Sequence, residues 1–140
     1  MTSKDVMAPV AAPRTRAEVL LDQYAVALSV VMLLFGLRQW AIILGVIPGG
    51  GGPFEQMSTA WAAVTIHLAV VDLVAAVGLW LKVAGGKVLW IYSALFEIAM
   101  HTVFVSTFGP SLSVVAFHLA TLAVFGALTI AAYRQARSEV

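Results

Sequence analysis

The sequence predicts an all-α polytopic membrane protein, folded as an antiparallel bundle of four transmembrane helices. Of its 140 residues, 61% are hydrophobic and only 11% are charged, whereas about a quarter of the residues of soluble domains are charged. Four apolar stretches are each about 20 residues or longer, the length that crosses a hydrocarbon core roughly 30 Å thick. Short segments rich in glycine or proline separate these stretches.

The ends of the expected helices have recognisable local signals. Thr15 and Glu18 have the spacing of a capping box, in which a hydroxyl and a glutamate satisfy the first backbone N–H groups. The tetraglycine between prolines at 48–53 ends the first helix, and turns at 85–87 and 108–111 separate the later ones. Connections this short favour antiparallel neighbours.

We therefore divide the chain into three parts. A cytoplasmic tail that we expect to be disordered precedes a transmembrane domain, and a second cytoplasmic tail follows it. These parts cover residues 1–15, 16–133 and 134–140, and the spans cover about 20–46, 58–81, 88–107 and 113–133.

Orientation follows from the basic residues outside the spans, which all fall on one side of the expected membrane. They are Lys4, Arg14, Arg16, Lys82, Lys87, Arg134 and Arg137. The 47–58 loop and the 108–112 turn contain no Lys or Arg. Because cytoplasmic loops are enriched in these residues, both termini are expected in the cytoplasm.

Six ionisable residues fall within the predicted spans: Arg38, His67, Asp72, Glu97, His101 and His118. A charge at the centre of a span costs roughly 2.5–3.5 kcal/mol, so such residues usually face the bundle interior and find partners. At about 1.5 Å per residue, all except Asp72 lie roughly 10–16 Å from the outer ends of their helices. We therefore expect these five to form one intramembrane polar cluster, with Asp72 deeper.

Several interpretations of this polar cluster remain open. In the structural one, Arg38 pairs with Glu97, and the histidines bond to neighbouring hydroxyl or backbone groups. Arg38 could instead extend toward the outer headgroups. In the second, Glu97 and the histidines form a path for protons or cations. In the third, His67, Glu97, His101 and His118 bind zinc or iron, or two of the histidines bind haem b. No metal or other cofactor is assigned.

Small residues form a stripe on each of two helices, which is the spacing that allows close helix packing in lipid. These candidate partner-facing positions are Ala62, Ala69, Asp72 and Ala76 on the second helix and Ala116, Ala120, Ala123 and Ala127 on the fourth. If Asp72 faces outward, a partner must supply a basic or hydroxyl group.

Composition and motifs exclude several classes of function. The absence of cysteine removes disulfides, thiol catalysis and cysteine-bound metal centres. The net charge of +1 and the absence of a recognition motif argue against nucleic-acid binding. No phosphate loop or catalytic triad is recognisable, so a role other than catalysis is favoured.

Three stretches carry a resemblance to a known group of proteins. They are Phe35-Gly36-Leu37-Arg38-Gln39-Trp40-Ala41, Gly78-Leu79-Trp80-Leu81, and the segment from Leu89-Trp90 to Glu97. Over about residues 20–132, the chain resembles a family of small four-span alphaproteobacterial proteins of unknown function. In layout it is also similar to the DoxX-like membrane proteins. The resemblance implies a location in the bacterial inner (plasma) membrane and transfers no catalytic residue.

Our first hypothesis is an accessory or assembly subunit that associates with other membrane helices, as a homo-oligomer or within a larger complex in the lipid. The alternatives are a small proton- or cation-coupled transporter that uses Glu97, and a haem- or metal-binding membrane protein.

Overall fold

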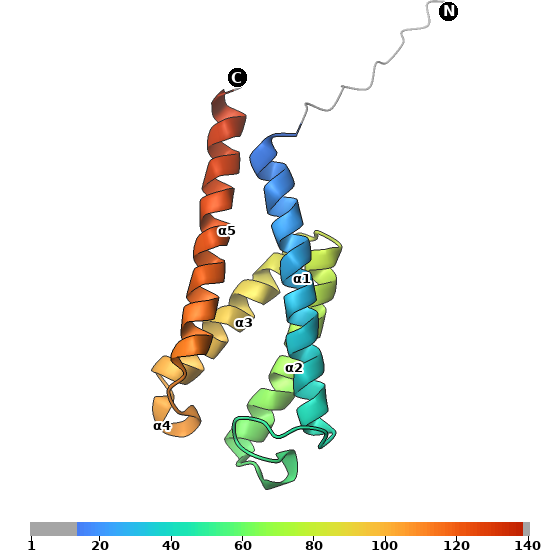
Figure 1. Ribbon diagram of the computed structural model, residues 1–140, viewed down its shortest axis with the longest axis vertical. Helices are drawn as coiled ribbons and strands as arrows, with labels where there is room; N and C mark the ends of the chain where they lie inside the picture. The colour runs from blue at the N-terminus through green and yellow to red at the C-terminus, as the bar shows by residue number, and fades with distance from the viewer. Residues whose placement is uncertain (1–13, 139–140) are drawn as a thin grey trace, which may run out of the picture.

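The computed structural model describes residues 14–138, which fold almost entirely into helices (Figure 1). The helices are α1 (Arg16–Ile43), the short 3-10 helix η1 (Phe54–Gln56), α2 (Thr59–Trp80), α3 (Ala84–Thr102), α4 (Val105–Phe108) and α5 (Leu112–Ser138). Across residues 14–138 there is no β-strand, and one isolated backbone bridge joins Gly49 to Gly52. The predicted all-α class is confirmed. Residues 1–13 of the tail expected to be disordered lie outside the described residues.

Three of the described helices are long and apolar enough to cross a membrane: α1, α2 and α5. This composition is that of a membrane protein. The third predicted span corresponds to α3, which has 19 residues and does not belong to this set. Lys87, Glu97 and His101 interrupt the apolar run of α3.

Figure 1 shows the arrangement of the long helices. Helices α1 and α5 run along the long axis, and α1 begins at the end where α5 finishes. The most extensive helix contact is between α1 and α2, followed by that between α2 and α3. Helix α3 leads diagonally from the end of α2 to α4 and the start of α5 (Figure 1). Helix α5 packs less extensively, against α1 and α3.

The capping box predicted at the start of α1 is confirmed. The Glu18 backbone N–H donates to the Thr15 hydroxyl at 3.2 Å, and the Thr15 N–H donates to the Glu18 carboxylate at 2.8 Å. Each bond satisfies a backbone donor that has no partner within the helix.

The turn between α2 and α3 differs from the prediction. Gly85 and Gly86 lie inside the first turn of α3, and the turn falls instead at Leu81–Val83, where Lys82 has a φ of 56°. A side chain at Gly86 would overlap the backbone of Gly78 on α2. The glycines therefore serve close helix packing, for which small residues are favoured in lipid.

Other helix ends also differ from the expected ones. Helix α1 ends at Ile43, before Gly45, whose φ of 72° does not continue a helix. Helix α3 ends at Thr102, after which the Phe104 N–H bonds to the Ala99 carbonyl at 3.0 Å. Residues 134–138, expected in a tail, are helical in α5.

An apolar cluster occupies the half of the molecule nearer the start of α1. We call it the core cluster; it comprises Ala25, Leu28, Met32, Ala75, Ala76, Leu79 and Trp90. Trp90 is 1% exposed and packs edge-on against Phe125 of α5, with ring centroids 5.3 Å apart. This cluster fills the interior there, and the Glu97–His118 pair lies in the other half.

Candidate functional site

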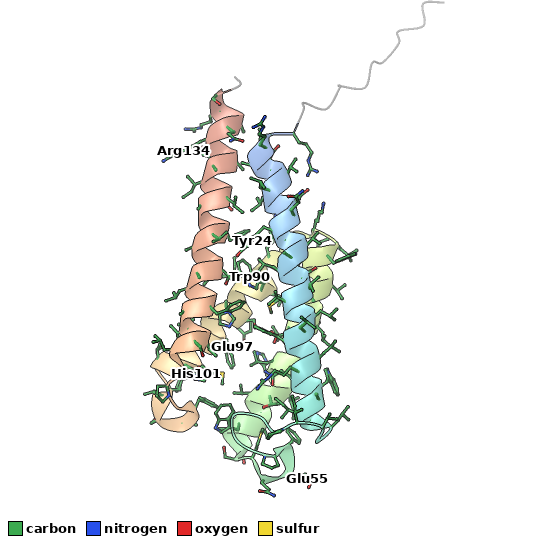
Figure 2. All side chains as sticks on the ribbon, in the orientation of Figure 1. Tyr24, Glu55, Trp90, Glu97, His101 and Arg134 are labelled. Carbon is green, nitrogen blue, oxygen red and sulfur yellow. The ribbon has the colours of Figure 1, made fainter. Side chains whose placement is uncertain are left out.

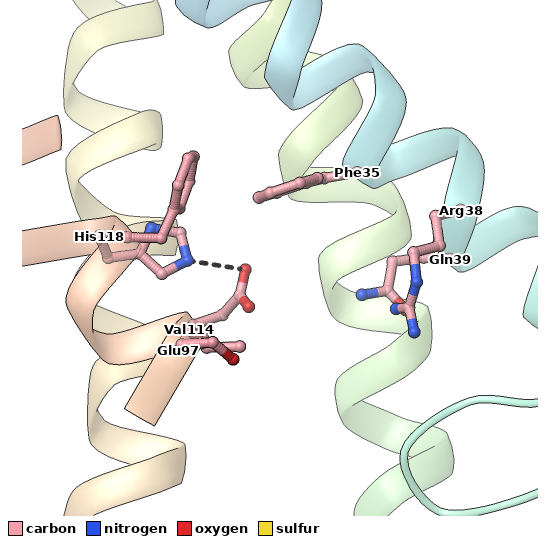
Figure 3. A pocket seen from close by; sticks show the side chains of 8 residues that line it. Phe35, Arg38, Gln39, Glu97, Val114 and His118 are labelled. Atoms are coloured by element: carbon pink, nitrogen blue, oxygen red, sulfur yellow. Dashed lines mark ion pairs between the residues drawn. The ribbon is translucent and has the colours of Figure 1, made fainter. Parts of the chain in front are cut away.

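Glu97 of α3 and His118 of α5 form an ion pair in the half of the molecule that contains the 44–58 loop (Figure 3). The His118 Nε2 lies 3.5 Å from the Glu97 Oε1, and the pair is charged on both sides when the imidazole is protonated. Helices α3 and α5 bring the two side chains together because the short α4 segment folds one helix back against the other.

His118 is the most completely enclosed residue of α5. It is 1% exposed, and neither ring nitrogen has a hydrogen-bond partner among residues 14–138. Phe35 and Phe117 surround the imidazole, with ring centroids 6.4 Å and 5.2 Å from it. Buried polar groups in proteins are nearly always hydrogen-bonded, so an unbonded imidazole needs an explanation in function or in a bound species.

A cavity of about 320 Å³ lies beside this pair, with walls that are both polar and aromatic. Arg38 and Gln39 of α1 face Glu97 and His118 across it (Figure 3). Phe35 contributes an apolar wall.

A second cavity of about 320 Å³ shares Arg38, Gln39 and Glu97 with the first. Gly50 of the 44–58 loop and Pro110 of the turn before α5 also line it. The two cavities therefore form one polar region that reaches the loops at this end of the molecule.

His101 lies on the wall of the second cavity, one helical turn from Glu97. Its Nδ1 bonds to the Gly109 carbonyl at 2.8 Å, and because a carbonyl only accepts, Nδ1 carries the proton. This bond ties the end of α3 to the turn that begins α5. Figure 2 shows Glu97 and His101 on the same stretch of α3.

The predicted pairing of Arg38 with Glu97 is not found. The charged partner of Glu97 is His118, and Arg38 forms no ion pair with any residue in the described range. Arg38 belongs to α1, which packs chiefly on α2, whereas Glu97 and His118 lie on adjacent faces of α3 and α5. Arg38 nevertheless lines both cavities.

His67 lies apart from the other predicted members of the polar cluster. Its Nε2 bonds to the Tyr92 hydroxyl at 2.9 Å, and its ring packs against Phe96 at a centroid distance of 5.0 Å. The four side chains suggested as metal ligands therefore do not converge. Within residues 14–138, no group of three His, Cys, Asp or Glu side chains is arranged to hold a metal ion.

Asp72 is buried within this chain and does not face a partner. It is 0% exposed, and Ser93 of α3 donates a hydrogen bond to its Oδ1 at 2.6 Å. Ala69 and Ala76 are buried beside it on α2, because this face packs against the other helices of the same chain. The partner-facing prediction is therefore wrong for these three residues. Ala62, the fourth, is half-buried.

The small-residue stripe of α5 does face outward. Its predicted positions Ala116, Ala120, Ala123 and Ala127 are all exposed. Of the residues in the most apolar stretch of each helix, only 6% are buried in α5, against 28% in α1 and 39% in α2.

Four residues at or near the site were not among the candidate site residues predicted from the sequence: Phe35, Gln39, Ser93 and Phe117. Ser93 precedes Glu97 by four residues, so the helical period could have placed both on one face of α3. The others carry no signal of their own, because their importance depends on how α1 meets α5.

The apolar helices and the enclosed acid–histidine pair define the class: an all-helical membrane protein with a polar site in its interior. The chain belongs to the family of unknown function DUF6163, whose model matches residues 19–136. No curated protein and no solved structure matches the chain.

Proposed function

We propose that this chain is a four-span inner-membrane protein that takes up a proton from the outer compartment at Glu97 and His118. Protonation is coupled to the movement of a small solute through the adjoining cavity. The observation that carries this proposal is the enclosed His118 imidazole, which lacks a hydrogen-bond partner in the described chain and lies 3.5 Å from the Glu97 carboxylate. Acid–histidine pairs inside membrane spans are typical of proton relays.

The connections between the helices support a fourth span. Helices α2 and α5 are both long enough to cross a membrane, and α3 leads from the end of α2 back to the start of α5. A chain that crosses in α2 and again in the same direction in α5 must return between them, and α3 is the segment available for this return.

Charge supports the orientation, with both termini in the cytoplasm. Figure 2 shows Arg134 at the end opposite Glu55 of the 44–58 loop. The carboxylate of Asp22, in the second turn of α1, forms ion pairs with Arg14 at 2.8 Å and with Lys82 at 3.1 Å. These ion pairs hold the basic turn between α2 and α3 next to the basic start of α1, so the two segments lie on the same side. The positive-inside rule assigns such basic segments to the cytoplasm.

A pH titration by infrared difference spectroscopy in lipid tests the proton site. We expect a carboxyl group that changes protonation, and we expect Glu97→Gln to remove the signal of one carboxyl per chain. His118→Gln should move the midpoint of that signal because it removes the neighbouring titratable group. Glu55→Gln, a change at an exposed carboxylate outside the spans, is the matched control and should leave the Glu97 signal unchanged.

Identical spectra for the wild type and Glu97→Gln, with both proteins folded, would contradict the proposal. Circular dichroism of each variant establishes that the helices are retained.

The exposed face of α5 favours a second candidate function, that of an accessory or assembly subunit. In this membrane-length helix only 6% of the residues of the apolar stretch are buried, so most of them are at least partly accessible to lipid or to another helix. Its exposed alanines would allow a neighbouring helix to approach closely. Recovery of a stoichiometric partner from native membranes tests this function.

A further inference from the structure

Arg38 is a cation without an anion in the described chain. It lies five residues before the end of α1, within a helix of membrane length, and forms no ion pair with residues 14–138. A guanidinium within a span is costly unless it is paired or solvated. The carboxylate that shares its cavity, Glu97, lies with His118 instead.

The cavity next to Arg38 has the features of a binding site for a small amphipathic molecule. Its volume of about 320 Å³ is at the lower limit of ligand pockets, which hold about 300–1,000 Å³. The rings of Phe35 and Phe117, whose centroids are 5.5 Å apart, offer an apolar wall. Arg38 and Gln39 offer hydrogen-bond donors at its edge. A guanidinium binds carboxylates in a bidentate geometry.

The charges around Glu97 determine how such a ligand would act on it. Arg38 of α1 shares both cavities with Glu97, and Asp72 of α2 accepts a hydrogen bond from Ser93, one helical turn from Glu97 on α3. His101 lies one turn away on α3, and His118 of α5 contacts it. An anion bound at Arg38 would offset the positive charge that Glu97 experiences from α1. It would also add a like charge to the cavity, and both effects favour the protonated form of Glu97.

We infer that the cavity binds a small organic carboxylate, held by Arg38 and Gln39 with its apolar part against Phe35 and Phe117, and that each anion bound brings one proton to Glu97. This inference rests on the proposed proton site and names the class of its solute. The proton comes from the outer compartment and the carboxylate of Glu97 accepts it, so the bound anion and proton together add no net charge. Binding linkage is reciprocal, so acidification should equally strengthen anion binding.

The test is calorimetric titration of the full-length protein in detergent with benzoate, in two buffers of different ionisation enthalpy. The difference in heat between the buffers gives the number of protons taken up. We expect saturable binding with about one proton per benzoate, and no such binding of benzamide, a neutral molecule of similar shape. Arg38→Gln should weaken benzoate binding at least about tenfold, equivalent to about 1.4 kcal/mol. Arg134→Gln, at the opposite end of the molecule, is the matched control and should leave it unchanged.

Glu97→Gln separates this inference from the proposed function. It should retain benzoate binding while proton uptake falls to zero. Benzoate binding with full proton uptake in Glu97→Gln would overturn both statements. Failure of the wild type to bind benzoate, with an intact Glu97 infrared signal, would overturn the carboxylate inference alone.

A lipid headgroup is the other source of an anion for Arg38, and native mass spectrometry distinguishes it. Retention of phosphatidylglycerol by the wild type and its loss in Arg38→Gln, without benzoate binding, would assign Arg38 to a lipid phosphate and overturn the inference.

Discussion

Asp72 and Ser93 form the most deeply buried contact between polar side chains in the described chain. Both residues are 0% exposed, and the Ser93 hydroxyl donates to the Asp72 Oδ1 at 2.6 Å. The second carboxylate oxygen, Oδ2, has no hydrogen-bond partner among residues 14–138. A buried acceptor without a partner costs free energy. The hydrogen bond from Ser93 therefore offsets much of the free energy needed to bury the Asp72 carboxyl group.

Ser93→Ala should therefore destabilise the fold by about 1–3 kcal/mol, the range for a buried polar group that loses its partner. The matched control is Ser29→Ala. Ser29 is also buried, but its hydroxyl donates at 2.6 Å to the Val26 carbonyl within its own helix. In Ser29→Ala the Val26 carbonyl keeps its hydrogen bond within the helix. We therefore expect the free energy of unfolding to fall by only about 0.5 kcal/mol, the lower limit for one hydrogen bond.

Unfolding with an increasing fraction of sodium dodecyl sulfate in mixed micelles measures both values. Equal decreases in the free energy of unfolding for the two serine variants would show that the Asp72–Ser93 bond stabilises the fold no more than the Ser29 bond does.

The sequence predicts which residues belong to the polar site around Glu97 better than it predicts which of them contact one another. Helical period alone puts Glu97 and His101 on one face of α3, and both line the second cavity. The relative rotation of α1 and α2 has a weaker signal, because apolar residues are spread around both helices instead of being gathered on one face. Two expectations depended on that rotation and are not met: the pairing of Arg38 with Glu97, and the possible partner-facing position of Asp72.

At the scale of the helices, the packing is uneven. Helix α1 contacts α2 closely at Gly36, where a Cβ would lie 2.6 Å from the Leu73 Cδ2. Helices α2 and α3 approach as closely at Gly78 and Gly86. By contrast, α5 meets the others along one narrow face, which includes a bond from the Tyr24 hydroxyl to the Thr121 carbonyl at 2.7 Å. The first three long helices therefore form the compact part of the fold, and α5 has a free outer surface.

If the outer surface of α5 binds another helix, a large side chain on the alanine stripe should prevent it. We expect Ala120→Trp to reduce the recovery of a stoichiometric partner at least about tenfold after purification from native membranes in mild detergent. Thr129→Trp is the matched control, because Thr129 is exposed on the same helix but lies on the opposite face from Ala120. A wild-type protein recovered only as a monomer would contradict the subunit function.

At the scale of the whole molecule, the polar and basic features lie toward opposite ends. The core cluster surrounds Trp90, while the two cavities reach Gly50 and Pro110 at the other end. The basic residues Arg14, Lys82 and Arg134 lie beyond the core cluster. In the conformation described, the polar cavities lie nearer the loop end, and the basic residues lie nearer the opposite end.

The absence of cysteine makes the topology directly testable, since any introduced cysteine is unique. We expect a membrane-impermeant maleimide to label Glu55→Cys and Ser106→Cys in intact spheroplasts. It should label Gly85→Cys only after permeabilisation; a side chain at Gly85 meets no neighbouring atom, so this variant should fold. Labelling of Gly85→Cys and Ser106→Cys from the same side would mean that α3 does not cross the membrane.

The core cluster has an electrical consequence. A transmembrane voltage falls mainly across the part of a protein that excludes water and ions, and a full crossing is worth about 2.3 kcal/mol per charge per 100 mV. If water enters the cavities from the loop end and the apolar residues around Trp90 exclude it, most of the voltage would fall between Trp90 and the basic end. In the proposed orientation, Glu97 would then be held close to the potential of the outer compartment. The site would respond to external acidity and remain largely insensitive to the membrane voltage.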